Sequence, residues 1–219
     1  MEESPKIIVV MGVSGCGKST VGKLVAGGLR CEFVEGDEYH TPENIAKMGS
    51  GHPLEDEDRR GWMAALNRKL CEVVQSGGRA VLACSALKAI YRVVQLNFTP
   101  EITSCLYALI LSTFSIKFLK QHMNSSIYGV IFSWNSLYRE WLTEGLAGRR
   151  VRFIFIRGDF EAISQRMEER RGHYMKANML RSQFDALEEP EGAHTHTYDL
   201  SLGSDLIAKQ ALDALSEKN

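Results

Sequence analysis

Residues 6–20 read KIIVVMGVSGCGKST, and this stretch decides the fold. Five apolar residues lead directly into a glycine-rich loop that matches G-x-x-x-x-G-K-[ST] through Gly12, Gly17, Lys18 and Ser19. Glycines permit backbone torsions and close approaches that a Cβ forbids, so successive N–H groups can converge on an anion at the positive end of a helix. The stretch therefore predicts a phosphate-binding loop between a buried strand and a helix over 18–29.

The residue types of this loop indicate how it would hold a nucleotide. Lys18 would reach the β and γ phosphates, the Ser19 hydroxyl would ligate Mg²⁺, and Thr20 would support the neighbouring phosphate. We interpret Cys16 as a small residue that supplies a backbone N–H rather than as a redox sensor. The expected cofactors are ATP and Mg²⁺, and the expected nucleotide-binding residues are Gly12, Val13, Ser14, Gly15, Cys16, Gly17, Lys18, Ser19 and Thr20.

Further along the chain, short apolar runs alternate with helical patterns. Thr41 and Pro42 predict an N-cap followed by proline at the first helical position. The alternation is typical of an α/β fold in which helices flank a parallel sheet. Five strands are expected, at 6–11, 31–37, 80–85, 151–158 and 195–201.

Length and composition limit the possible functions. The 219 residues are 44% apolar, which suits a single domain over 1–219, and the formal net charge of -1 gives no indication of a nucleic-acid or membrane partner. The five cysteines form no CxxC pair, and the first residues, MEESPK, resemble no targeting signal. We therefore expect a cytoplasmic protein with reduced thiols, which acts on a small molecule.

Two classes of phosphate-loop protein were compared. A switch GTPase needs DxxG behind an apolar strand and an NKxD motif; residues 58–61 fit the first pattern but lie in an acidic run, and NKxD does not occur. A small kinase remains, and it must hold a second substrate opposite the loop and exclude water from the γ-phosphate.

Two acidic residues follow the second predicted strand. Glu35 and Asp37 stand two apart at the edge of the sheet where open α/β folds bind ligands. One carboxylate, Asp37, can orient an attacking hydroxyl, and its neighbour Glu35 can hold Mg²⁺ through water. The spacing alone also leaves open a pair of solvated loop acids.

Three stretches resemble the gluconokinase family. Residues 36–62 read GDEYHTPENIAKMGSGHPLEDEDRRGW, 84–92 read CSALKAIYR, and 158–190 read GDFEAISQRMEERRGHYMKANMLRSQFDALEEP. The first is similar to the family signature, with Asp-x-x-His, Lys-Met, Gly-x-Pro-Leu and Asp-x-Asp-Arg elements. Two departures are Glu35, where aspartate is frequent, and Gly61, where proline is common.

The resemblance implies a P-loop NTPase fold of nucleoside-monophosphate-kinase type with a mobile lid at about 166–178. It also implies transfer of the γ-phosphoryl group of ATP to the 6-hydroxyl of D-gluconate, giving 6-phospho-D-gluconate. Whether the protein forms a homodimer is left open.

The same resemblance implies roles for further residues. Cations would bind the gluconate carboxylate. Side chains that donate or accept hydrogen bonds would bind its hydroxyls. The expected catalytic residues are Lys18, Asp37, Arg166 and Arg170. The expected substrate-binding residues are Asp37, His40, Asn44, Arg59, Lys88, Arg92 and His173. For His40, packing at the start of the following helix is an equal alternative, and for Asp159 capping of a helix is favoured over contact with a metal-bound water.

One segment does not match its surroundings. The 47 residues 93–139 hold four charges, while the whole chain is 24% charged, and the uncharged run 102–116 is too short for a membrane-spanning helix. Joining Arg92 directly to Glu140 restores a sequence similar to gluconokinases throughout. We interpret 93–139 as an atypical insertion that arises from non-coding sequence or a splice form, with a true family-specific insertion as the alternative.

Two other functions stay open at this point. If the insertion damages the substrate side, the protein is a catalytically impaired nucleotide-binding form. Among the small kinases, shikimate kinase is the nearest competitor, because it also pairs acids at the end of the second strand.

Overall fold

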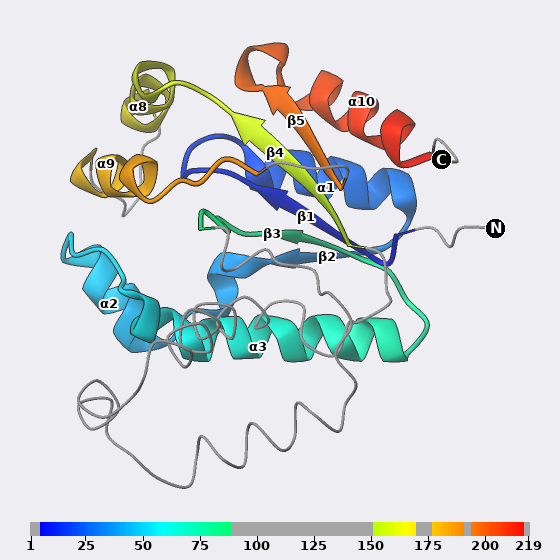
Figure 1. Ribbon diagram of the computed structural model, residues 1–219, viewed down its shortest axis with the longest axis horizontal. Coiled ribbons are helices and arrows are strands. Elements are labelled where there is room, and N and C mark those ends of the chain that lie inside the picture. The colour runs from blue at the N-terminus through cyan, green and yellow to red at the C-terminus, as the bar shows by residue number, and fades with distance from the viewer. Residues whose placement is uncertain (1–4, 89–150, 170–176, 191–193, 217–219) are drawn as a thin grey trace, which may run out of the picture.

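The computed structural model describes residues 5–88, 151–169, 177–190 and 194–216 (Figure 1). Its centre is a sheet in the order β2-β3-β1-β4-β5, and every neighbouring pair is parallel. The strands are β1 (Ile7–Met11), β2 (Glu32–Glu35), β3 (Ala80–Ala83), β4 (Val151–Arg157) and β5 (Thr195–Asp199). The predicted five-stranded parallel α/β fold is confirmed.

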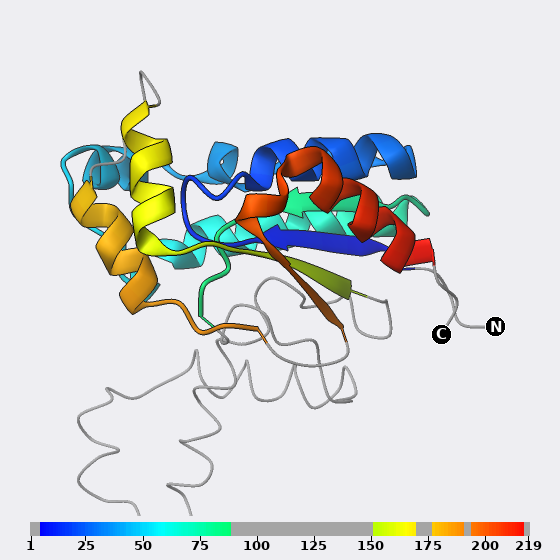
Figure 2. The same cartoon turned by 90° about the horizontal axis from the view of Figure 1, so that it is seen from above.

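Helices cover both faces of this sheet, and others stand at the carboxyl end of its strands (Figures 1 and 2). The α-helices of the described residues are α1 (Lys18–Leu29), α2 (Pro42–Gly49), α3 (Asp56–Gln75), α8 (Phe160–Glu169), α9 (Ala177–Asp185) and α10 (Ser204–Ser216). Two short 3-10 helices, η1 (Gly36–Tyr39) and η4 (Leu200–Leu202), follow β2 and β5. None of the helices in the described ranges is both long and apolar enough to cross a membrane.

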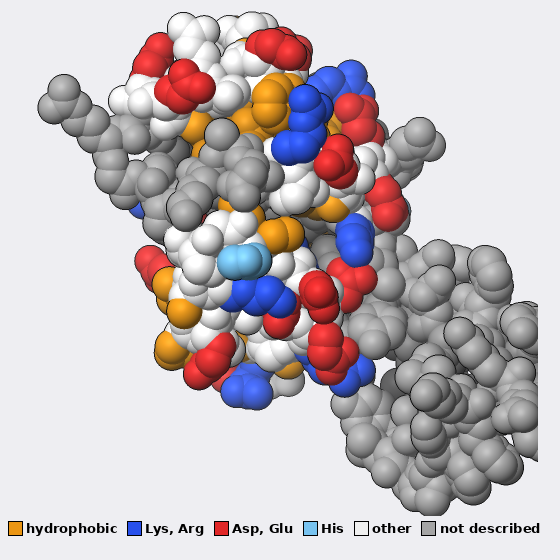
Figure 3. All heavy atoms as spheres, turned by 90° about the vertical axis from the view of Figure 1, so that its left-hand side faces the viewer, with side chains coloured by type: hydrophobic (Ala, Val, Ile, Leu, Met, Phe, Trp, Pro, Cys, Tyr) orange, Lys and Arg blue, Asp and Glu red, His pale blue; other side chains and the backbone are white. Residues whose placement is uncertain are grey.

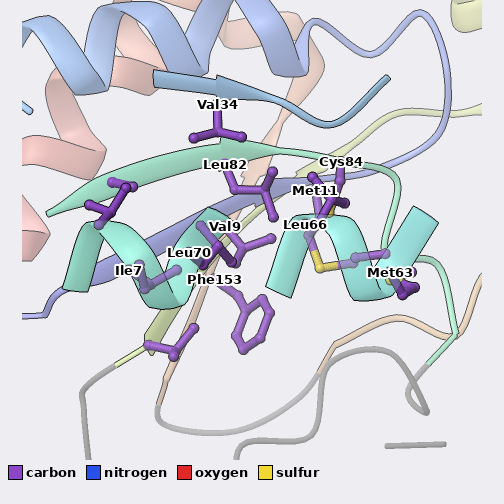
Figure 4. Close-up of a cluster of buried hydrophobic side chains, with 14 of the residues drawn as sticks. Ile7, Val9, Met11, Val34, Met63, Leu66, Leu70, Leu82, Cys84 and Phe153 are labelled. Carbon is purple, nitrogen blue, oxygen red and sulfur yellow. The ribbon is translucent and has the colours of Figure 1, made fainter. Parts of the chain in front are cut away.

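The core lies in two layers, because alternate strand residues point to opposite faces. Ile7, Val9 and Met11 pack with α3 through a cluster that includes Leu66 and Leu70 (Figure 4). Ile8 and Val10 belong to the opposite layer, with residues of α1 and α10. Burial on both faces explains why β1 reads as an unbroken apolar run.

The second strand ends earlier than the sequence predicts. We expected 31–37, but β2 stops at Glu35 and Asp37 lies in η1. The next residue is Gly36, where an added Cβ would lie 2.6 Å from the Ala83 carbonyl oxygen of the neighbouring strand, so this close approach requires glycine. The chain turns out of the sheet at this point, which brings Asp37 over the carboxyl end of β3 rather than along the edge.

Two other predicted strands also end two residues early: β3 stops at Ala83 rather than at 85, and β5 stops at Asp199, directly before η4, rather than at 201. Thr41 caps α2, and its Oγ1 accepts the Asn44 N–H at 3.3 Å, as predicted. Residues 84–88 form no helix, so Lys88 lies on a loop as far as the structure describes the segment. The insertion at 93–139 and most of the expected lid lie outside the described residues.

Candidate active site

The phosphate loop joins β1 to α1, and its backbone requires glycine. Gly12, Gly15 and Gly17 have φ angles of 143°, 85° and 101°, which side chains rarely adopt. A Cβ on Gly12 would also lie 2.8 Å from the Ile156 carbonyl oxygen of β4. Because β1 and β4 are paired, the loop cannot move away from this contact. Its shape is therefore set by the sheet, and the N-terminus of α1 follows it directly.

The loop presents its lysine at the end of β1. Lys18 is the first residue of α1, and its Nζ donates to the Val13 carbonyl oxygen at 3.0 Å. This bond holds the ammonium group across the mouth of the loop. A cation in that position can meet the terminal phosphates of a nucleotide.

Ser19 and Glu35 form a pair of oxygen donors beside the loop. The pKa of the Glu35 carboxylate is raised mainly by burial; the neighbouring Ser19 hydroxyl lowers it, and the nearby Asp37 raises it. Hydroxyl and carboxylate oxygens suit Mg²⁺, which is usually held by few protein groups and by substrate phosphates. Within the described residues no group of three or more His, Cys, Asp or Glu could form a full cage. These residues fit a magnesium ion shared with a nucleotide.

Lys18 also lines a cavity of about 360 Å³. We call it the acceptor cavity; Figure 3 views the molecule from this end, where acidic and basic side chains mix. Its apolar walls include Met48, Leu54, Leu87 and Met179. Its polar lining includes Ser14, Lys18, Asp37, His40, Asp56, Arg59, Lys88 and Gln183. Of the predicted site residues, the structure therefore brings together Ser14, Lys18, Asp37, His40, Arg59 and Lys88.

Besides Lys18, two cations line the acceptor cavity, and they are held differently. Lys88 Nζ bonds both carboxylate oxygens of Asp56, at 2.7 and 2.8 Å. Arg59 donates from Nη2 to the Leu54 carbonyl oxygen at 3.1 Å, and a guanidinium group carries five N–H donors. An anionic ligand must therefore compete with Asp56 for Lys88, whereas Arg59 can serve it while keeping its bond to Leu54.

His40 lies between the acceptor cavity and the core. Its ring stacks on Trp62 with centroids 4.4 Å apart, and the Trp62 Nε1–H donates to the Gly36 carbonyl oxygen at 2.6 Å. His40 Nδ1 is buried without a hydrogen-bond partner among the described residues. Burial lowers the pKa of His40, Asp37 opposes this effect, and Arg59 adds to it. Both earlier interpretations of His40 thus have a structural basis: the ring packs at the start of α2 and also faces the cavity.

Asn44 does not line the acceptor cavity. Its side chain is 4% exposed, and Nδ2 donates to the Asp58 carbonyl oxygen at 2.9 Å. A second link between the same helices is the ion pair of Lys47 with Asp58, at 2.6 Å. Asn44 joins α2 to the first turn of α3 in this structure, and its contact with a substrate hydroxyl stays a prediction.

Arg166 lies on the other side of the phosphate loop. It is an exposed residue of α8 that lines a second cavity of about 440 Å³, together with Asp159, Ser201 and Gly203. The Asp159 Oδ1 accepts the Ala162 N–H at 2.7 Å, so Asp159 caps α8 as favoured from the sequence. The predicted site residues Arg92, Arg170 and His173 lie outside the described residues.

Cys16 and Cys84 are fully packed against the site. Both thiols are buried, and burial raises the pKa of Cys16 and raises that of Cys84 to about 12. Neither forms a thiolate near neutral pH. This agrees with the interpretation of Cys16 as a small residue of the loop.

Among the residues of the acceptor cavity that sequence reasoning missed are Asp56 and Gln183. Asp56 is one of four consecutive acids, and only the contact with Lys88 distinguishes it. Gln183 comes from α9 and bonds Ser14 across the sheet edge, through 2.7 Å and 3.0 Å hydrogen bonds. The family-like stretch 158–190 contains Gln183, but no spacing or charge pattern in it points to the phosphate loop.

Comparisons with known proteins agree with this geometry. A family model described as shikimate kinase matches residues 14–105. A protein named "Probable gluconokinase" from Rattus norvegicus is 36% identical over 97% of this chain and 99% of its own length. The "Thermoresistant gluconokinase" of Escherichia coli K12 is 33% identical over 86% of this chain and 80% of its own.

Solved structures give the same result. The crystal structure of a gluconokinase from Sinorhizobium meliloti 1021 has a TM-score of 0.67 at 32% identity and covers 98% of this chain and 94% of its own. The crystal structure of a sugar kinase from Janibacter sp. HTCC2649 has a TM-score of 0.68 at 29% identity and covers 98% of this chain and 99% of its own. With relatives of this identity aligned over most of both chains, the protein belongs to the gluconokinase family.

Proposed function

We propose that the protein transfers the γ-phosphoryl group of ATP to the 6-hydroxyl of D-gluconate, giving 6-phospho-D-gluconate. The observation that carries the proposal is that Lys18 of the phosphate loop and Asp37 line one cavity with Arg59 and Lys88. A polyol acid needs this combination: cations for its carboxylate and a carboxylate to orient the reacting hydroxyl. The relatives named above are gluconokinases.

Asp37 acts on the attacking hydroxyl. Its carboxylate accepts the hydrogen bond of the 6-hydroxyl and takes up the proton as the new oxygen–phosphorus bond forms and the bond to the ADP oxygen breaks. Lys18 stabilises the charge that develops on the transferred phosphoryl group. Magnesium, held by Ser19 and Glu35, would neutralise phosphate charge and orient the phosphates.

The acceptor cavity separates the two ends of the substrate. Arg59 and Lys88 bind the gluconate carboxylate, and Asp37 and His40 contact hydroxyls. His40 lines the cavity, so its imidazole can bond a substrate hydroxyl there. Asn44, Arg92 and His173 remain assigned to the substrate as part of the same proposal.

The nucleoside end of ATP is placed at the second cavity. That cavity lies between α8 and the segment after β5. Gly17 of the phosphate loop is close to Ser204 of α10: a Cβ added at Gly17 would lie 3.6 Å from Ser204 Oγ. Arg166 would stabilise phosphate charge from this cavity. Arg170, which lies outside the described residues, remains assigned to the same task as part of the proposal.

Organisation and location complete the proposal. We treat 1–219 as one kinase domain interrupted at 93–139. To test this organisation, the melting temperature and the turnover rate are measured for the chain with and without residues 93–139. Cytoplasmic location is supported by the cysteines, since no disulfide joins those in the described ranges. Whether two copies associate is a matter for sedimentation or light scattering.

A substrate panel tests the function. Purified protein with ATP and Mg²⁺ is offered gluconate, shikimate and other polyols, and ADP formation is followed by a coupled assay. We expect turnover that depends on gluconate. Turnover with shikimate alone would favour shikimate kinase, the family whose model matches residues 14–105. Nucleotide binding without any turnover would favour a catalytically impaired form.

A further inference from the structure

A glutamine side chain connects the phosphate loop to the helix on its acceptor side. The Ser14 backbone N–H donates to Gln183 Oε1 at 2.7 Å, and Gln183 Nε2 donates to Ser14 Oγ at 3.0 Å. The amide is therefore bonded at both ends to one residue of the loop, although the two residues are 169 positions apart. Ser14 and Gln183 also both line the acceptor cavity.

The helix that carries Gln183 is firmly attached to the rest of the molecule. Leu180 of α9 is fully buried, and Phe184 meets Phe160 of α8 edge-on with centroids 5.5 Å apart. Beyond the helix, the Glu188 N–H donates to the Leu87 carbonyl oxygen at 2.9 Å, directly before Lys88. Figures 1 and 2 both show α9 beside α8 at the carboxyl end of the sheet. The Gln183 amide is thus presented by the same body that forms the acceptor wall.

Ser14 occupies the part of the phosphate loop that faces the acceptor. It lines the cavity with Lys18 and Asp37, whereas the following loop residues lead into α1. Without Gln183, the Ser14 N–H would have to bond water or shift. A small displacement here changes the distance between the donor phosphate and the acceptor hydroxyl, and phosphoryl transfer depends steeply on this distance.

We propose that Gln183 is a positioning residue for phosphoryl transfer, which acts through Ser14 to hold the acceptor side of the phosphate loop against the acceptor cavity. The inference rests on the proposed function and adds a residue to it. It requires an effect on the rate of transfer rather than on nucleotide affinity, because the loop residues from Gly15 to Thr20 still surround the phosphates.

The test compares four proteins with the wild type: Gln183→Met, Ser14→Ala, the double variant and Ser14→Thr. Methionine keeps the shape of glutamine but breaks both bonds, so we expect kcat with gluconate to fall by about tenfold or more. KM for ATP should stay within about twofold, because the remaining backbone donors are unchanged. Ser14→Ala alone should lower kcat less than Gln183→Met does. Added to Gln183→Met, it should cause no further loss of kcat. Ser14→Thr should retain most of kcat because its hydroxyl remains.

A matched control lies on the same helix. Arg181 contacts the Phe160 ring at 4.3 Å and does not line the acceptor cavity. Arg181→Met should therefore lower the melting temperature by as much as Gln183→Met while leaving kcat unchanged. This separates a loss of helix packing from a loss of positioning.

The possible outcomes are distinct. Unchanged kcat for Gln183→Met, or a loss confined to KM for ATP and the melting temperature, would overturn the proposal. If Gln183→Met does not fold, Ser14→Ala alone decides, since it removes one hydroxyl only. A wild type that phosphorylates a different acceptor would contradict the gluconate assignment by itself, and the same comparison of variants on that acceptor would then decide the role of Gln183.

Discussion

The phosphate loop and the acceptor cavity meet at Lys18 and are built in different ways. The loop comes from one continuous stretch, and its shape depends on backbone torsions at Gly12, Gly15 and Gly17. The acceptor cavity takes its lining from η1, α3, the segment after β3 and α9. The first site therefore depends on what the backbone can adopt, and the second on which distant side chains meet. Substitutions should affect the two sites differently.

Lys18→Ala should have the largest effect, because Lys18 is common to both sites. Loss of a cation aimed at developing charge should lower kcat by about a thousandfold, as one preorganised stabilising group is worth several kcal/mol. The side chain is only partly buried, so the melting temperature should change little. Lys23→Ala provides the control, since Lys23 is an exposed lysine of the same helix. Unchanged turnover of Lys18→Ala would contradict the assignment of the loop.

Asp37→Asn should be next, and it should affect the acceptor side alone. The amide keeps the shape but cannot take a proton, so kcat with gluconate should fall by about a hundredfold or more. ATP affinity, measured by titration with a fluorescent analogue, should stay within about twofold. The neighbouring exposed acid allows a control, Glu38→Gln. Equal losses of turnover and ATP affinity would mean that Asp37 is not the orienting base.

These two residues also show how far the sequence alone could lead. Lys18 was predictable because a local pattern of glycines, strand and helix fixes its position. Asp37 was expected in the second strand, but it lies in η1, because the chain leaves the sheet at Gly36, which approaches β3 closely. Its role in the reaction stays a prediction. The close approach of Gly36 depends on the pairing of β2 with β3, which no local pattern reveals.

The acceptor cavity was less predictable for the same reason. Lys88 was expected to meet a substrate carboxylate, but its bond to Asp56 joins residues 32 positions apart. Asn44 was expected in the site, yet its amide is used to link α2 with α3. Long-range contacts of this kind decide whether a polar residue serves a ligand or the fold, and the sequence gives no direct measure of them.

A pair of glycine substitutions sharpens the contrast at the level of stability. Gly12→Ala should destabilise the protein by about 1–3 kcal/mol and weaken ATP binding, because φ is 143° and the new Cβ would meet the Ile156 carbonyl oxygen. Gly27→Ala in α1 has open space around it and should stabilise by about 0.5–1 kcal/mol. Melting curves should therefore shift in opposite directions. A loop that accepts alanine at residue 12 would contradict its dependence on the backbone.

The smallest effect is expected at His40, where packing and substrate contact can be separated. His40→Phe keeps a ring to stack on Trp62 but removes Nδ1, which is buried without a partner in the described structure. If the imidazole bonds a substrate hydroxyl, KM for gluconate should rise by about tenfold, the value of one hydrogen bond. If the ring only packs, KM should not change.

The dependence of stability on pH gives an independent reading of the same residue. Burial lowers the pKa of His40 below its ordinary 6.5, so between these two values the unfolded chain binds a proton that the folded chain does not. The stabilising contribution is therefore complete above pH 6.5 and is lost as the pH falls through the lower, folded-state pKa. Wild-type protein should lose more melting temperature between pH 7.5 and 5.5 than His40→Phe, by up to about 3 °C in a domain of this size. His52→Gln, a change at an exposed histidine, should leave the wild-type slope unaltered. Equal slopes for the wild type and His40→Phe would show that the imidazole titrates as it does in water, and would remove the reason to place a neutral His40 beside Asp37 in the acceptor cavity.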